Sequence, residues 1–110
     1  MEYYAPEYVP EGYVPTVETK DFSGVIIFYD LNENEFVEFN QRVLDTDLKI
    51  DSTDVETYGV TVNGRGATVI RHLDEKYVHL LWDDGRYRYY LAGTFSPETL
   101  IKMAESLKPF

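Results

Sequence analysis

YVHLLWDDGRYRYYL, residues 77–91, contains two runs of β-forming residues on either side of the dipeptide Asp84-Gly85. This dipeptide suits the left-handed backbone of a two-residue type I′ turn, so we expect a β-hairpin in which Trp82 lies opposite Tyr87. The further pairs expected from this register are Leu80 with Tyr89, Val78 with Leu91, Leu81 with Arg88, and His79 with Tyr90. The stretch therefore fixes both the strands and the side chains that share each face.

Asn63-Gly64 predicts a second hairpin upstream of this stretch, because it is the same kind of turn dipeptide between β-forming runs. The expected pairs are Val62 with Arg65, Val60 with Ala67, and Tyr58 with Val69. A four-residue loop over 73–76 would place Val69 beside Leu80 and join the hairpins into a four-stranded meander. One face of this meander is then apolar, with Tyr58, Val60, Val62, Ala67, Val69, Val78, Leu80, Trp82, Tyr87, Tyr89 and Leu91.

The opposite face of the predicted meander mixes polar and aromatic side chains. Its members are Thr61, Thr68, Ile70, His72, Tyr77, His79, Leu81, Arg88 and Tyr90. Aromatic residues and Arg are enriched where proteins bind partners. We therefore expect a binding site at Tyr77, His79, Leu81, Arg88 and Tyr90, although docking of the N-terminal residues on this face is a serious alternative.

A C-terminal helix follows the strands and is signalled at both ends. Ser96 is a good N-cap, and Pro97 suits the first helical position. The residues Leu100, Met103, Ala104 and Leu107 follow a helical apolar spacing. We expect Pro109 to end the helix and the apolar stripe to cover the sheet face that carries Trp82.

The first half of the chain is less regular. Residues 1–22 alternate Tyr, Pro and Glu, which favours an extended arm, and residues 23–110 are expected to form a single domain. A hairpin with a four-residue turn over 31–34 would place Phe28 opposite Val37, and residues 44–57 are expected to be a surface connection. The predicted fold class is α+β: an antiparallel, curved β-sheet, a meander of about six to seven strands, packed on one C-terminal α-helix.

The composition excludes several classes of function. The 110 residues include no Cys, so thiolate catalysis and thiolate metal sites are absent. The formal net charge is −10: residues 1–64 carry 14 acidic and 3 basic residues (−11), and residues 65–110 carry 6 acidic and 7 basic residues (+1). Without a basic patch, binding to nucleic-acid phosphates is not expected.

Candidate catalytic and metal-binding groups have simpler explanations. The acidic pairs, such as Asp83-Asp84 and those between residues 45 and 54, stand in turns and connections, where Asp bonds the local backbone. The 45–54 run lacks the Gly and Glu of a calcium loop. His72 and His79 are expected one strand apart, and only Asp74 or Glu75 is near enough in sequence to add to them as zinc ligands. We therefore predict no catalytic residues, no metal site and no cofactor.

Three segments resemble a known family. They are Tyr8-Val9-Pro10-Glu11-Gly12-Tyr13, the strand ending near Phe39-Asn40-Gln41, and the run from Leu81-Trp82 through Ser96-Pro97-Glu98 to Ala104-Glu105-Ser106-Leu107. In order and spacing they resemble the family of domains of unknown function numbered 4367. Members are typically the extracytoplasmic C-terminal part of membrane-anchored proteins of Gram-positive bacteria, some with an anti-sigma-factor-like N-terminal half.

The resemblance implies a non-enzymatic sensor or binding module at the extracytoplasmic face of the cell membrane. Its expected partner is a protein, a peptide or an envelope component, and its contact with the membrane would be through an anchor segment that this chain lacks. The chain is therefore expected to be a soluble fragment of such a protein, with a free-standing protein as the alternative. Two other functions stay open: a small carboxylate-dependent hydrolase and an acidic mimic of nucleic acid.

Overall fold

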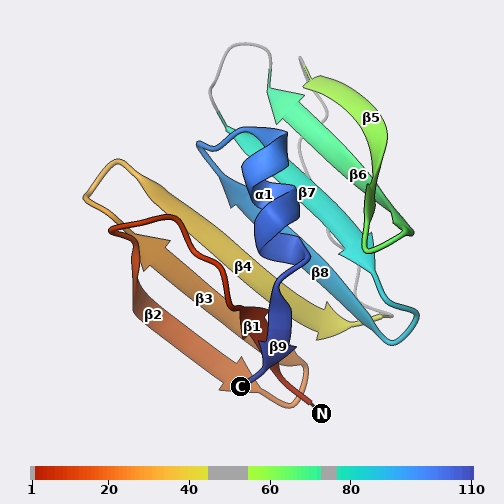
Figure 1. Cartoon of the computed structure of the whole chain (residues 1–110). Helices are drawn as coiled ribbons and strands as arrows, with labels where there is room; N and C mark the ends of the chain where they lie inside the picture. The colour runs from red at the N-terminus through yellow and green to blue at the C-terminus, as the bar shows by residue number, and fades with distance from the viewer. Residues whose placement is uncertain (1, 45–54, 73–76) are drawn as a thin grey trace.

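A computed structural model describes residues 2–44, 55–72 and 77–110 of the chain (Figure 1). The strands are β1 Tyr4–Pro6, β2 Val14–Asp21, β3 Gly24–Asp30, β4 Phe36–Val43, β5 Val55–Val62, β6 Arg65–His72, β7 Val78–Asp83, β8 Tyr87–Gly93 and β9 Leu107–Pro109. Helix α1 spans Pro97–Ala104. Seven strands form one antiparallel sheet in the order β2-β3-β4-β8-β7-β6-β5, and β1 pairs with β9. The predicted α+β class, an antiparallel sheet with one C-terminal helix, is confirmed.

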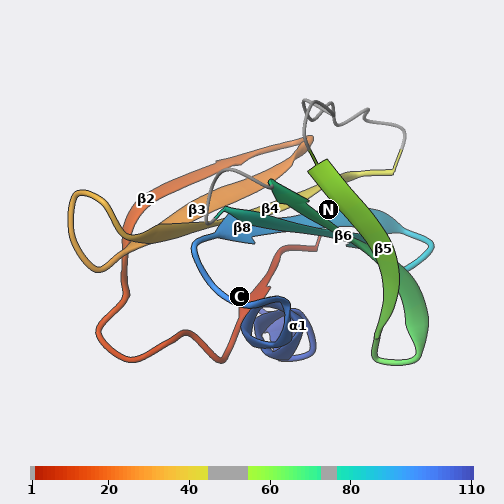
Figure 2. The same cartoon turned by 90° about the horizontal axis from the view of Figure 1, so that it is seen from above.

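The sheet consists of two meanders, β2-β3-β4 and β5-β6-β7-β8, which join where β4 pairs with β8. Helix α1 and the segment before β2 lie on the same side of this curved sheet (Figure 2). We call this side the helix face. Within the described residues, no helix has the length and apolar character needed to cross a membrane.

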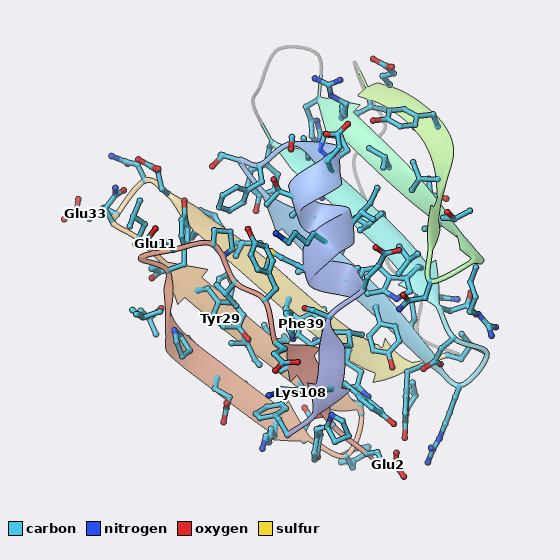
Figure 3. The ribbon with its side chains drawn as sticks, viewed as in Figure 1. Glu2, Glu11, Tyr29, Glu33, Phe39 and Lys108 are labelled. Atoms are coloured by element: carbon cyan, nitrogen blue, oxygen red, sulfur yellow. The ribbon has the colours of Figure 1, made fainter. Side chains whose placement is uncertain are left out.

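The predicted core is confirmed on the helix face. Trp82, Leu80, Val69 and Leu91 are all buried, and α1 turns Leu100, Met103 and Ala104 toward them. The Trp82 ring stacks on Tyr89 at 5.2 Å between ring centroids. Tyr29 and Phe39 extend the core beneath the N-terminal segment (Figure 3).

The Asn63-Gly64 turn has the predicted register. Val62 pairs with Arg65 and Tyr58 with Val69, and positive φ angles at Asn63 (50°) and Gly64 (80°) give the turn its left-handed backbone. The expected loop 73–76 lies outside the described residues. The strands on its two sides nevertheless pair as predicted, with Ala67 opposite Trp82 and Val69 opposite Leu80.

The predicted register of the Asp84-Gly85 hairpin is wrong by two residues. Trp82 lies opposite Tyr89, and Leu81 opposite Tyr90. The carboxylate of Asp84 accepts the backbone N–H groups of Arg86 and Tyr87, and its own N–H donates to the Tyr87 carbonyl, which closes a four-residue loop in place of a two-residue turn. Because two residues are one full strand period, every side chain keeps its predicted face.

The predicted pairing of β3 with β4 is wrong by one residue. Tyr29, not Phe28, lies opposite Val37, because the connecting loop has five residues and closes through the Leu31 N–H and the Glu35 carbonyl. A one-residue slip exchanges the faces of a strand. Phe28 therefore lies on the sheet side opposite to α1.

The helix starts as predicted but ends early. The Ser96 hydroxyl accepts the Thr99 N–H at 3.3 Å, as an N-cap does. The helix stops at Ala104 and not near Pro109, because the Ser106 hydroxyl and N–H both bond the Met103 carbonyl and turn the chain into β9. Leu107, expected in the helical stripe, is a β9 residue instead.

The N-terminal segment docks on the helix face. The buried side chain of Gln41 accepts the Tyr4 N–H at 2.8 Å and donates to the Glu2 carbonyl at 2.7 Å. Residues 14–21, expected to be part of an extended arm, form the edge strand β2 of the sheet. At the other end of the first meander, residues 55–57, expected in a surface connection, belong to β5, and residues 45–54 lie outside the described part of the chain.

Candidate functional site

The sheet face opposite α1 carries the predicted binding residues. His79 and Leu81 lie on β7, Arg88 and Tyr90 on β8, and Tyr77 immediately before β7. We call this side the histidine face and define it by Phe28, Phe36, Glu38, His72, Tyr77, His79, Leu81, Arg88 and Tyr90. Among the described residues, α1 and the N-terminal segment both lie on the other side of the sheet. The expectation that the N-terminal segment competes for this face is therefore not met in the described structure.

Two histidines and a tyrosine form a hydrogen-bonded chain at the centre of this face. The Nε2 atoms of His72 and His79 are 2.9 Å apart, and the Nδ1 atom of His79 is 2.8 Å from the Tyr90 hydroxyl. Three neighbouring strands supply these groups: β6, β7 and β8. His79 is buried, with only 7% of the residue exposed, and both of its ring nitrogens have a hydrogen-bond partner.

Aromatic rings continue from this chain across the sheet. The Tyr77 ring lies 5.1 Å from the His79 ring and 6.0 Å from Phe36, which in turn lies 6.1 Å from Phe28. These separations are those of favourable tilted and edge-on ring pairs. The result is a row of rings that runs from β7 to β3.

Burial changes the acid–base properties of this row. It raises the pKa of the half-buried Glu38 carboxyl, whose oxygen nevertheless accepts a hydrogen bond from Asn40. Burial, with a smaller effect of the charge of Glu38, raises the pKa of Tyr77 to about 12, and the same causes raise that of Tyr90. Burial and the neighbouring His72 lower the pKa of His79 to about 4, so His79 is neutral at pH 7.

Two hollows flank the row on this face. One, of about 330 Å³, lies over β2–β4 and has apolar walls of Val17, Phe28 and Phe36 beside Asp30, Glu33 and Asn32. The second, of about 320 Å³, lies over β6–β8. It is lined by Gly66, Ala67, Thr68, Leu81, Trp82, Asp83 and Arg88. Leu81 and Arg88 are thus brought together at the second hollow, while Tyr77, His79 and Tyr90 meet at the row of rings.

The candidate carboxylates and metal ligands are placed as follows. Asp83 accepts the Gly85 N–H, and Asp84 accepts the N–H groups described above as well as the Tyr89 hydroxyl. Burial acts to raise the pKa of Asp84, but these donors outweigh it and hold the pKa below its usual value. Among the described residues, no three or more His, Asp or Glu side chains meet to hold a metal ion. Asp74, Glu75 and the acidic residues between 45 and 54 lie outside the described part of the chain.

The sequence analysis missed Phe28, Phe36 and Glu38. The expected register paired Phe28 with Val37, whereas Phe28 lies opposite Glu38. The pairing of β4 with β8 brings Phe36 beside Tyr77 and Glu38 near Tyr77 and Tyr90, and no turn signal in the sequence predicts that pairing. The alternation of Phe36 and Glu38 with the buried Val37 and Phe39 is the local signal that they share one face.

Comparison with known proteins gives one match. The family model described as "Domain of unknown function (DUF4367)" matches residues 3–107, which run from the N-terminal segment into β9. The chain belongs to this family. The match covers every strand of the seven-stranded sheet and the helix. No curated protein and no solved structure gives a match.

Proposed function

We propose that this domain is a non-enzymatic binding module whose histidine face holds a basic, apolar segment of a partner protein. The observation that carries the proposal is the hollow over β2–β4, where Val17, Phe28 and Phe36 form apolar walls beside Asp30 and Glu33. Apolar surface provides the affinity of such a site, and the acidic groups select the sign of the ligand charge.

The charge of the molecule supports this choice of partner. The net charge is −10, and 14 of the 20 acidic residues stand in the half of the sequence that contains the hollow. Such a field attracts a cationic ligand and repels nucleic acid. Val17 is 52% exposed, so apolar surface is available at the rim of the hollow over β2–β4.

The setting that we propose is the extracytoplasmic part of a membrane-anchored regulatory protein of Gram-positive bacteria. Such a protein would resemble an anti-sigma factor in its N-terminal half. The family resemblance of the sequence supports this setting. In it, binding of a partner segment outside the membrane would be the signal that the module senses.

The test uses defined peptides and the whole chain. A short peptide of alternating Lys and Leu should shift the backbone amide NMR signals of Val17, Phe28 and Phe36. A Glu-Leu peptide and a Lys-Ser peptide should not, because the first has the wrong charge and the second lacks apolar side chains. Affinity should fall as salt is added, since exposed charges are screened.

Matched variants locate the site. The double variant Asp30→Asn, Glu33→Gln should bind the Lys-Leu peptide several-fold more weakly. The control Glu56→Gln, Glu98→Gln removes the same number of charges at exposed positions on β5 and α1 and should bind like the parent. Equal weakening in both variants would mean that only the net charge matters, and the proposed site would be rejected.

A further inference from the structure

We propose that His72 and His79 form a two-imidazole binding site for a divalent transition-metal ion, Cu²⁺ first and Ni²⁺ second, on the histidine face. This inference is independent of the peptide-binding proposal. It rests on the geometry of the pair and of Tyr90.

The separation of the two nitrogens matches two adjacent ligands of a tetragonal metal site. The Nε2 atoms are 2.9 Å apart. Two nitrogens at about 2.0 Å from a metal ion and at right angles are about 2.8 Å apart, whereas a tetrahedral angle requires about 3.3 Å. Tetragonal nitrogen and oxygen sites are typical of Cu²⁺ and Ni²⁺, and Cu²⁺ binds most strongly in the divalent series.

The strands hold the pair in this position. His79 pairs with Ile70 on β6, so His72 lies two residues farther along the neighbouring strand on the same face. The two rings stand at 63° to each other with their centroids 5.0 Å apart. To share an ion, both rings must turn about χ2, which is a broad torsion in histidine, so that their lone pairs point to one position. The Tyr90 hydroxyl must turn with the His79 ring to keep its bond to Nδ1.

Tyr90 supplies the support that a metal-binding histidine needs. Its hydroxyl lies 2.8 Å from Nδ1 of His79 and can accept the Nδ1 hydrogen. In that tautomer the Nε2 lone pair of His79 faces His72. The ion then takes the place of the single hydrogen between the two Nε2 atoms, and the hydrogen of His72 moves to its own Nδ1. Histidine ligands in metal sites are usually fixed by such a bond from the second nitrogen.

Water completes the coordination in this proposal. Among the described residues there is no third His, Asp or Glu that joins the pair. A two-imidazole site with water ligands is an open site and binds more weakly than a structural zinc site with four protein ligands. We therefore expect exchangeable binding of one ion per chain.

The experiment uses the fact that the chain contains only two histidines. Cu²⁺ is titrated into the full chain, and the electron paramagnetic resonance spectrum of the complex is recorded. We expect one ion per chain and splitting from two imidazole nitrogens. His72→Gln, at a half-buried position, should reduce the affinity by at least about tenfold and leave at most one imidazole signal. Tyr90→Phe should weaken binding while both imidazole signals remain.

A control separates this site from binding to the carboxylates of the hollow over β2–β4. Asp30→Asn, Glu33→Gln should leave the copper affinity and spectrum unchanged. Circular dichroism of each variant establishes that it is folded. His79→Gln should lose copper affinity as His72→Gln does. If His79→Gln does not fold, the copper affinity of His72→Gln alone tests the proposal. A His72→Gln variant that binds Cu²⁺ as tightly as the parent, or a parent spectrum without two imidazole nitrogens, would overturn the proposal.

Discussion

The two faces of the same sheet differ in how their side chains are stabilised. On the helix face, apolar groups such as Leu80 and Val69 are fully buried beneath α1 and the N-terminal segment. On the histidine face, the neighbouring residues His79 and Thr68 are polar, and His79 is held by ring contacts and hydrogen bonds. The alternation of a strand thus allows one segment to provide both the core and a chemically distinctive surface.

The comparison predicts the largest effect on the helix face. Trp82→Ala removes a ring that is 7% exposed and stacks on Tyr89. We expect a loss of about 3–5 kcal/mol in the free energy of unfolding, which is a large part of the stability of a domain of this size. Urea denaturation followed by circular dichroism measures it. A change within about 0.5 kcal/mol, the usual range for a surface substitution, would contradict the assignment of Trp82 to the core.

The next effect concerns the histidine face and depends on pH. The pKa of His79 is about 4 in the folded chain and about 6.5 in the unfolded chain, so between these values the unfolded chain binds the extra proton. Stability should therefore fall as the pH is lowered from about 6.5 to about 4, by up to about 3 kcal/mol. The other titratable groups facing His79 are His72 on β6, Tyr77, Tyr90 on β8 and Glu38 on β4.

Glu38 acts in the opposite direction, because its raised pKa favours the folded state as the pH falls. The variant His79→Gln isolates the histidine. Unfolding free energies of parent and variant, measured in chelator at a series of pH values, should diverge below pH 6.5. Parallel curves would show that His79 is protonated as easily in the folded chain as in the unfolded one.

A smaller effect is expected where the N-terminal segment joins the helix face. Gln41→Leu keeps the approximate volume but removes the bonds to Tyr4 and Glu2. We expect a cost of about 1–2 kcal/mol, because two partly buried backbone groups lose their partner. Hydrogen exchange should accelerate at the Tyr4 amide and stay slow at Leu80. Unchanged exchange at Tyr4 would mean that other contacts hold the segment.

The smallest effect is expected at the start of the helix. Ser96→Ala removes the acceptor of the Thr99 N–H and should cost about 1 kcal/mol. Ser96→Asp is the matched control, since Asp is an equally good N-cap and should restore the stability. Thermal unfolding measures both. Equal destabilisation by Ala and Asp would show that capping is not the role of Ser96.

The sequence predicted the fold best where a turn dipeptide controls it. Asn63-Gly64 predicted the correct register. The register error at Asp84-Gly85 was two residues, an even number, so every side chain stayed on its predicted face of the sheet. The one-residue error between β3 and β4 paired Phe28 with Val37 and not with Glu38, its neighbour on the histidine face. Loop length decides between these outcomes, and side-chain bonds such as that of Asp84 to Tyr87 set the loop length without a clear sequence signal.

The candidate site was predicted only within one hairpin. Tyr77, His79, Leu81, Arg88 and Tyr90 were placed on one face by alternation alone. The neighbours that give this face its acidic and aromatic character come from β3 and β4. They reach it through the β4–β8 pairing, which joins residues about 50 positions apart and has no local signature.

The pairing of β1 with β9 has a mechanical consequence. Tyr4 lies opposite Pro109, and the Tyr3 carbonyl accepts the Phe110 N–H, so the bond at one end of this ladder joins the two chain ends. The bond at the other end joins the Glu7 N–H to the Ser106 carbonyl. A force that pulls the two chain ends apart would break the hydrogen bonds between β1 and β9 one after another, starting with the bond of Phe110 to Tyr3. The two short strands should therefore separate at low force while the strands of the seven-stranded sheet stay paired.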